Sequence, residues 1–127
     1  MGRPVVHFEI TGRDGQALRS FYTRLFDWQI DADNPMGYGM VAREGNTTED
    51  GVGIGGGIAG MPEGEGGGYV TFYVSVPDVE ATLTQVESLG GSRALGPEKI
   101  SDDLVIGQFR DPEGNLIGVI QAMSQSA

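Results

Sequence analysis

The feature that most constrains this chain is an approximate repeat of its own sequence. Residues 6–10 are matched by residues 70–74, and each further matched pair is separated by the same 64 positions in a chain of 127 residues. The other matches are Asp14 with Asp78, Ala17 with Ala81, and Leu25 with Leu89. We therefore predict two similar modules, residues 1–62 and 63–127, that together form one compact domain.

Each module is predicted to begin with a strand and a helix. Residues 4–11 and 69–76 are rich in β-branched and aromatic side chains, which is typical of strands. Asp14 and Asp78 are suited to cap the helices that follow. Apolar residues spaced three and four apart, among them Phe21, Tyr22 and Phe26, predict that the first helix buries one face in the core.

Three shorter strands are expected after each helix. They lie at residues 28–33, 38–43 and 52–59 in the first module, and at residues 92–95, 104–110 and 116–121 in the second. Gly90 and Gly91 are expected to end the second helix, and residues 111–115 have the composition of a turn. The sequence thus predicts an α+β fold of two βαβββ modules.

The composition limits the possible partners. The net charge is −10, from 8 basic and 18 acidic residues, so little positive charge is available to neutralise nucleic-acid phosphates. There is no cysteine, which excludes disulfides and thiolate chemistry. No apolar run approaches the length of a membrane span, and no signal peptide is recognisable. We expect a cytoplasmic protein that binds neither nucleic acid nor membrane.

Three segments resemble the vicinal oxygen chelate superfamily, which includes glyoxalase I, bleomycin-resistance proteins, fosfomycin-resistance enzymes and extradiol dioxygenases. The first is residues 7–10 followed by the aromatic positions of residues 21–28. The others are residues 74–81 with residues 89–91, and residues 109–118. The resemblance implies that the two modules form a U-shaped mixed sheet around a cleft, and that the protein is a homodimer.

The resemblance also implies where a divalent metal would be bound. Relatives hold the ion with His, Gln or Glu from the cleft-facing strands, and His7 matches the first of these ligand positions. Thr71 and Gly118 occupy two of the others. His7 is thus the only retained ligand position, and one imidazole cannot hold a metal usefully. We expect no cofactor, with a weakly bound divalent metal as the alternative.

His7 and Glu9 are the candidate catalytic residues. They lie two positions apart, so their side chains are expected on the same face of the first strand. His7 could act in acid–base chemistry with Glu9 tuning its pKa, or bind a ligand. The simpler interpretation is a hydrogen-bonded histidine of structural importance, with Glu9 exposed to solvent if the predicted facing is wrong.

Further candidates for ligand binding come from the glycine-rich and aromatic segments. Residues 51–56 match the pattern of a dinucleotide-binding loop, but no helix is expected to follow, so nucleotide binding is disfavoured. Gly55 and Gly56 instead indicate a strand that something can approach closely. The remaining candidates are Thr71, Tyr73, Trp28, Tyr38, Tyr69, Phe109 and Gly118. For the aromatic ones, packing in the core is the favoured interpretation.

Three functions are compatible with these residues. The preferred one is a metal-independent small-molecule-binding protein that sequesters a cationic or aromatic compound. The second is an enzyme that uses His7 and Glu9, with or without a weakly bound divalent metal, and for which a lyase or isomerase is favoured over a dioxygenase. The third is a structural or interaction role as a dimer.

Overall fold

The computed structural model describes residues 2–34, 37–61 and 68–122. It divides into two compact units, Val6–Thr71 and Met1–Val5 with Phe72–Ala127, which we call the first and second units. The predicted boundary between residues 62 and 63 lies outside the described residues. Each unit contains one helix and a four-stranded mixed sheet, so the predicted α+β fold of two βαβββ modules is confirmed.

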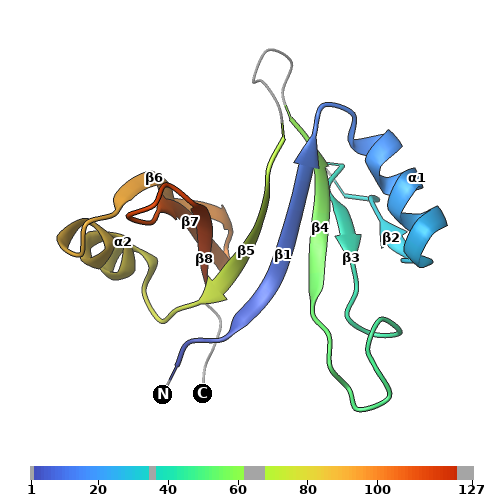
Figure 1. Cartoon of the computed structure of the whole chain (residues 1–127), viewed down its shortest axis with the longest axis horizontal. Helices are drawn as coiled ribbons and strands as arrows, with labels where there is room; N and C mark the ends of the chain where they lie inside the picture. Colours follow the sequence, from blue (N-terminus) through green and yellow to red (C-terminus); the bar gives the residue numbers. More distant parts are fainter. Residues whose placement is uncertain (1, 35–36, 62–67, 123–127) are drawn as a thin grey trace. The chain divides into compact units, whose positions relative to one another are not determined.

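The first unit contains β1 (Val5–Gly12), α1 (Gly15–Phe26), β2 (Ile30–Asp31), β3 (Gly39–Val41) and β4 (Gly55–Gly60). In space the strands follow the order β2-β3-β4-β1, and β1 and β4 are parallel while the other pairs are antiparallel. Figure 1 shows α1 beside this sheet. The predicted strands at residues 28–33 and 38–43 shrink to two and three residues.

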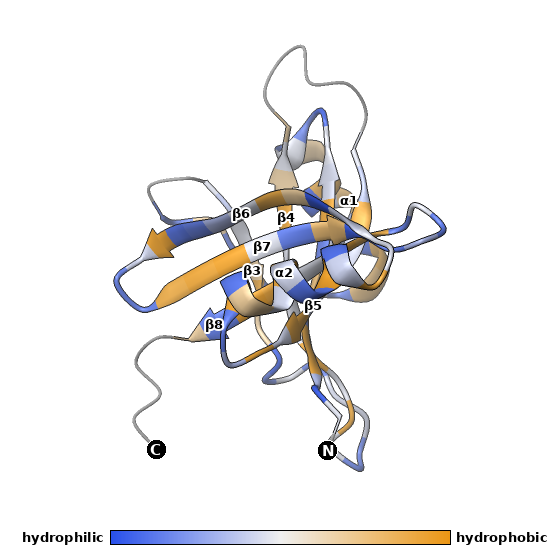
Figure 2. Ribbon diagram, turned by 90° about the vertical axis from the view of Figure 1, so that its left-hand side faces the viewer, coloured by the Kyte–Doolittle hydropathy of each residue, from blue (hydrophilic) through white to orange (hydrophobic). Residues whose placement is uncertain are grey.

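The second unit contains β5 (Val70–Ser75), α2 (Val79–Ser88), β6 (Ser92–Ser101), β7 (Leu104–Arg110) and β8 (Leu116–Ala122). The spatial order is β5-β8-β7-β6, with β5 and β8 parallel. β6 is longer than the predicted residues 92–95. Figure 2 shows α2 in front of this sheet, with the start of β7 coloured as strongly hydrophobic.

The predicted caps and turns are confirmed. The side chain of Asp14 accepts a hydrogen bond from the backbone of Ala17, and that of Asp78 accepts one from Ala81, both at 3.0 Å. α2 ends before Gly90, whose φ of 98° is in the left-handed region that glycine adopts at little cost. These local motifs fix where each helix begins and ends.

The buried core differs between the two helices. α2 buries Val79 and Leu83 completely, and they pack with Val76 and Val119. α1 buries no residue, and Phe21 and Phe26 are 57% and 53% exposed, so the prediction that they lie in the core was wrong.

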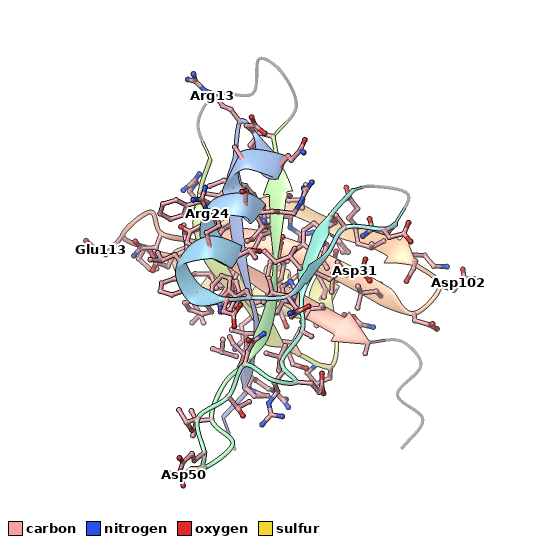
Figure 3. The ribbon with its side chains drawn as sticks, turned by 90° about the vertical axis from the view of Figure 1, so that its right-hand side faces the viewer. Arg13, Arg24, Asp31, Asp50, Asp102 and Glu113 are labelled. Carbon is pink, nitrogen blue, oxygen red and sulfur yellow. The ribbon has the colours of Figure 1, made fainter. Side chains whose placement is uncertain are left out.

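The reason for this difference lies in the sheet beside α1. On the side of β4 that carries Ile58, the neighbouring positions are Gly56 and Gly60, which offer no side chains for the helix to pack on. β2 and β3 are too short to extend that surface. Figure 3 shows α1 from its outer side, with Arg24 labelled on the helix and Asp50 at the tip of the β3–β4 loop.

Candidate functional site

The centre of the candidate site is the carboxylate of Glu9 on β1. Glu9 is 9% exposed, and each of its oxygens accepts a hydrogen bond from a tyrosine. The hydroxyl of Tyr38 donates to Oε1 at 3.0 Å, and the hydroxyl of Tyr69 donates to Oε2 at 2.6 Å. A buried carboxylate is costly unless it is hydrogen-bonded, and these two donors offset part of that cost.

His7 joins the same network through Tyr38. Its Nε2 lies 3.0 Å from the Tyr38 hydroxyl oxygen, and the two rings are nearly parallel, with centroids 6.3 Å apart and an interplanar angle of 16°. His7 and Glu9 therefore contact one tyrosine, which confirms that they share a face of β1. His7, Tyr38 and Tyr69 are half-buried, so the network is reachable from solvent on its outer side.

Tyr38 is positioned by hydrogen bonds to its backbone. The amide of Asn34 donates to the Tyr38 carbonyl at 2.7 Å, and the Asn34 side-chain oxygen accepts from the Tyr38 backbone N–H at 3.0 Å. Because one side chain holds both backbone groups, the start of β3 is fixed beside β4. This places the phenol ring above the sheet at the level of Glu9.

A glycine provides the space that the Tyr38 ring occupies. Gly57 on β4 pairs with Glu9 in the parallel register, and a Cβ atom at this position would overlap the Tyr38 side chain. Any other residue at position 57 would therefore displace the ring or the strand. The close approach expected of this glycine-rich strand is made here by a side chain of the protein itself.

Tyr69 is positioned from the other end of β1. Its backbone N–H donates to the Thr11 hydroxyl at 2.9 Å, and the Thr11 backbone N–H donates to the Tyr69 carbonyl at 2.9 Å. Thr11 is itself buried. This reciprocal pairing directs the Tyr69 side chain back along β1 to Glu9.

The electrostatics of the site favour a neutral imidazole. Burial lowers the pKa of His7 below its ordinary value of 6.5, because the charged form loses hydration. The negative charge of Glu9 opposes this shift but does not cancel it. This shift favours the uncharged imidazole, which has one ring N–H and one lone-pair nitrogen.

The second unit contains a comparable arrangement of different residues. Tyr73 on β5 pairs with Gly118 on β8, and a Cβ at Gly118 would lie 2.5 Å from the Tyr73 ring. The Tyr73 hydroxyl accepts a hydrogen bond from Gln108 Nε2 on β7 at 3.0 Å. Both units thus place a tyrosine ring over a glycine. In the first unit the tyrosine hydroxyl contacts an imidazole and a carboxylate, and in the second it accepts from an amide.

The other predicted site residues fall into separate groups. Trp28 packs on Phe8, Tyr22 and Phe26, at ring centroid distances of 5.2 to 5.5 Å. Phe8 and His7 are adjacent on β1, so Trp28 lies on the opposite face of the sheet from the network. A Cβ at Gly56 would contact Phe8, so Gly56 also belongs to that face, whereas Gly55 shares the face of Gly57.

The remaining predicted site residues lie on β5 and β7. Phe109 packs against the α2 core of the second unit. Thr71 is 5% exposed and shares a face of β5 with Tyr73. Any role of these residues in ligand binding stays a prediction.

Several residues that build the site were not singled out from the sequence. In the site they are Thr11, Asn34 and Gly57, and in the separate arrangement of the second unit it is Gln108. Gly57 had a usable signal, since it lies two positions after Gly55 and must share its face of a strand. Asn34 and Gln108 had none, because their partners are brought to them only by the folded chain.

The donor set does not fit the divalent metal that the fold family implies. Over residues 2–34, 37–61 and 68–122, no three histidine, aspartate or glutamate side chains converge on one point. His7 and Glu9 supply two ligands where three or four are usual, and both Glu9 oxygens already accept tyrosine protons. We therefore derive no chemical step through a metal.

Comparison with known proteins gives the family. The model of the Glyoxalase/Bleomycin resistance protein/Dioxygenase superfamily matches residues 5–119. The chain belongs to this superfamily. The resemblance seen in the sequence is therefore confirmed.

Curated relatives within the superfamily are longer than this chain. The protein described as "Putative glyoxylase CFP32", from Mycobacterium bovis and from Mycobacterium tuberculosis, is 34% identical over 113 residues. The match covers 86% of this chain and 42% of the relative. The chain thus spans less than half the length of the curated relatives it matches.

Solved structures of superfamily members share the fold. A member from Vibrio splendidus 12B01 has a TM-score of 0.60 and 20% identity, over 94% of this chain and 99% of that one. A methylmalonyl-CoA epimerase in complex with methylmalonyl-CoA has a TM-score of 0.65 and 18% identity, over 96% of both chains. A variant of the Streptomyces coelicolor methylmalonyl-CoA epimerase, in complex with 2-nitronate-propionyl-CoA, has a TM-score of 0.65 and 17% identity, over 98% of this chain and 99% of that one. At these identities the likeness shows the fold alone.

Proposed function

We propose that this protein binds a small organic molecule, without a metal, at the face of the first unit that carries His7, Tyr38, Glu9 and Tyr69. The observation that carries the proposal is the pair of tyrosine hydroxyls converging on one buried carboxylate at 3.0 and 2.6 Å. Such a preorganised polar cluster is typical of sites that orient a ligand by a few hydrogen bonds.

The chemistry of the cluster favours a planar or cationic ligand. The nearly parallel rings of His7 and Tyr38 offer an aromatic surface, and Glu9 offers a carboxylate next to the Tyr38 hydroxyl. A net charge of −10 adds a general attraction for cations. A role in sequestering such a compound, as in the drug-binding members that the sequence resembles, follows from this chemistry.

The test is a binding screen in which the NMR signals of the site residues are measured. The purified protein is titrated with a panel of planar organic cations and matched neutral aromatics, and the ring signals of His7, Tyr38 and Tyr69 are followed by NMR. We expect saturable shifts of these signals, and weaker binding after Glu9→Gln. Phe21→Ala on the outer side of α1 is the matched control and should bind as the wild type does. Shifts confined to other residues, or none, would contradict the proposal.

A proton-transferring isomerase is the second candidate. The chain of contacts from His7 through Tyr38 to Glu9 joins an imidazole to a carboxylate, and such groups can remove and return a proton. The shared fold with methylmalonyl-CoA epimerase gives this alternative some support. On this hypothesis Glu9 and His7 act in acid–base chemistry on a small acyl substrate, and a lyase reaction of the same residues is the related case.

Exchange of substrate hydrogen with solvent would test the enzyme hypothesis. Acyl-CoA thioesters and α-hydroxythioesters are incubated with the protein in D2O, with and without added nickel, zinc, manganese or iron. Deuterium incorporation that is lost in Glu9→Gln and His7→Gln would favour an enzyme over a binding protein. No incorporation under any condition would remove this candidate.

The assembly and location of the protein are also proposals. We infer a homodimer, as the resemblance implies, and sedimentation velocity at micromolar concentration should show a species of twice the monomer mass. A persistent monomer would contradict the dimer and with it the structural role. Within the described ranges, no helix has the length and apolar character needed to span a bilayer. A cytoplasmic location is proposed, to be checked by fractionation of cells.

A further inference from the structure

We propose that Tyr38 is a positioning residue that fixes which ring nitrogen of His7 carries the proton. Two contacts carry this inference. His7 Nε2 lies 3.0 Å from the Tyr38 hydroxyl oxygen, and that hydroxyl donates to Glu9 Oε1 at 3.0 Å. Together they form a chain of three groups, in which one hydroxyl is shared between an imidazole and a carboxylate.

The number of protons on these three groups determines which one donates in each hydrogen bond. A tyrosine hydroxyl has a single proton, and here it is donated to Glu9. The contact between His7 and Tyr38 is then favourable only if Nε2 carries a proton and donates it to the hydroxyl oxygen. A neutral imidazole has one N–H, so the lone pair lies on Nδ1.

Glu9 has a second tyrosine partner, Tyr69. Its hydroxyl donates to Glu9 Oε2 at 2.6 Å, so both carboxylate oxygens accept protons. A carboxylate oxygen accepts, so each of these two hydroxyls is the donor in its contact. The Tyr38 proton is directed toward Glu9 Oε1 and away from His7, and this contact does not involve the oxygen that Tyr69 reaches.

The position of Tyr38 is determined by the sheet as well as by its own hydrogen bonds. Asn34 holds its backbone through two hydrogen bonds, and Gly57 leaves room for the ring. These contacts hold the backbone of Tyr38 and leave the space over Gly57 for its ring. Burial of His7, which favours its neutral form, keeps the imidazole in the state to which the proton count applies.

The consequence for the proposed function is a defined basic atom. On this assignment the lone pair of His7 is on Nδ1 and the ring N–H is on Nε2. This consequence rests on the proposed function, but the tautomer itself is measured without any ligand. A failed ligand screen and a wrong tautomer are therefore distinguishable results.

The test is a long-range 1H–15N NMR correlation spectrum, which connects the imidazole nitrogens to the protons on the ring carbons. His7 is the only histidine, so a uniformly 15N-labelled sample gives one ring pattern without assignment. Above the pH at which His7 titrates, we expect a single tautomer with the proton on Nε2. A pattern with the proton mainly on Nδ1, or an even mixture, in the wild-type protein would overturn the proposal, whatever the variants show.

Variants separate a positioning role from general stability. Tyr38→Phe removes the acceptor of the Nε2 proton, and Gly57→Ala displaces the ring while keeping its hydroxyl. Both should introduce the second tautomer and accelerate exchange of the Nε2 proton with water by about fivefold or more, the equivalent of one lost hydrogen bond. Tyr69→Phe is the matched control, since it removes a hydroxyl from Glu9 but none from His7, and it should keep the wild-type ring pattern. Equal effects of Tyr38→Phe and Tyr69→Phe would contradict a specific role of Tyr38.

Discussion

The phenol ring of Tyr38 occupies the space that a side chain at Gly57 would need. Gly57 pairs with Glu9 across the parallel strands β4 and β1, so a ring over position 57 brings its hydroxyl to within 3.0 Å of the Glu9 carboxylate. The absence of a side chain at position 57 is thus a structural requirement of the polar network.

Replacing Gly57 by alanine should destabilise the protein. The added methyl group overlaps the Tyr38 side chain, and overpacking of this kind costs about 1–3 kcal/mol. The measurement is the free energy of unfolding in urea. In the double variant Gly57→Ala with Tyr38→Ala the methyl group has room, so alanine at position 57 should cost much less there than in the wild type. An equal cost in both backgrounds would contradict this contact.

The stability contributed by His7 should depend on pH. Its pKa is lowered in the folded protein by burial, so the unfolded chain binds the proton more readily. Unfolding is therefore favoured as the pH falls through 6.5, the ordinary pKa of histidine. The contribution of His7 to stability is fully present only above that pH. We expect the free energy of unfolding of the wild type, relative to His7→Gln, to rise between about pH 5 and 7.5. Urea titrations at several pH values would measure it, and subtracting the variant removes the contribution of the carboxylates. A difference that is flat or falls with pH would be inconsistent with a buried neutral imidazole.

Tyr73 and Gln108 should be energetically coupled. The amide of Gln108 donates to the Tyr73 hydroxyl at 3.0 Å, and both side chains are buried. Tyr73→Phe removes the hydroxyl oxygen that accepts from the buried amide of Gln108, and this loss costs about 1–3 kcal/mol of stability. A double-mutant cycle with Gln108→Leu should give a coupling energy of about 0.5–1.5 kcal/mol. Additive effects of the two substitutions would show that the contact contributes nothing to stability.

The two helices should differ in their tolerance of truncation. Leu83→Ala on α2 removes a completely buried side chain and should cost about 2–5 kcal/mol. Phe21→Ala on α1 removes a side chain that is 57% exposed and should cost less than about 1 kcal/mol in the monomer. Thermal and urea unfolding at low protein concentration would measure both. Similar losses would indicate that α1 is buried in solution.

Local sequence was sufficient for much of the fold. Asp14 and Asp78 mark the helix starts because an aspartate side chain can accept the unpaired N–H groups of the first turn. Residues 111–115 were predicted as a turn, and the structure confirms it: Gly114 takes a φ of 90° and donates its N–H to the Asp111 carbonyl. These features depend on residues a few positions apart, so a single sequence records them.

The sequence predicted the burial of side chains less accurately than it predicted the helices and turns. The apolar spacing of α1 was recognised correctly, but Phe21 and Phe26 remain exposed because β4 offers glycines where a helix needs side chains. The same helical pattern in α2 is buried on a sheet with long strands. Periodicity shows which residues share a face, whereas the surface opposite that face decides whether it is buried.

The sequence by itself determined the duplicated module, the family, and the common face of His7 and Glu9, since each depends on order and spacing along the chain. Only the tertiary structure decided what these two residues touch. Tyr38 and Tyr69 lie 29 and 60 positions from Glu9, and Gly57 lies on a strand that reaches β1 through the packing of the whole first unit. The hydrogen-bonded network forms only when these distant segments are folded together, because hydrogen bonds act over about 3 Å while the sequence separates their partners by tens of residues.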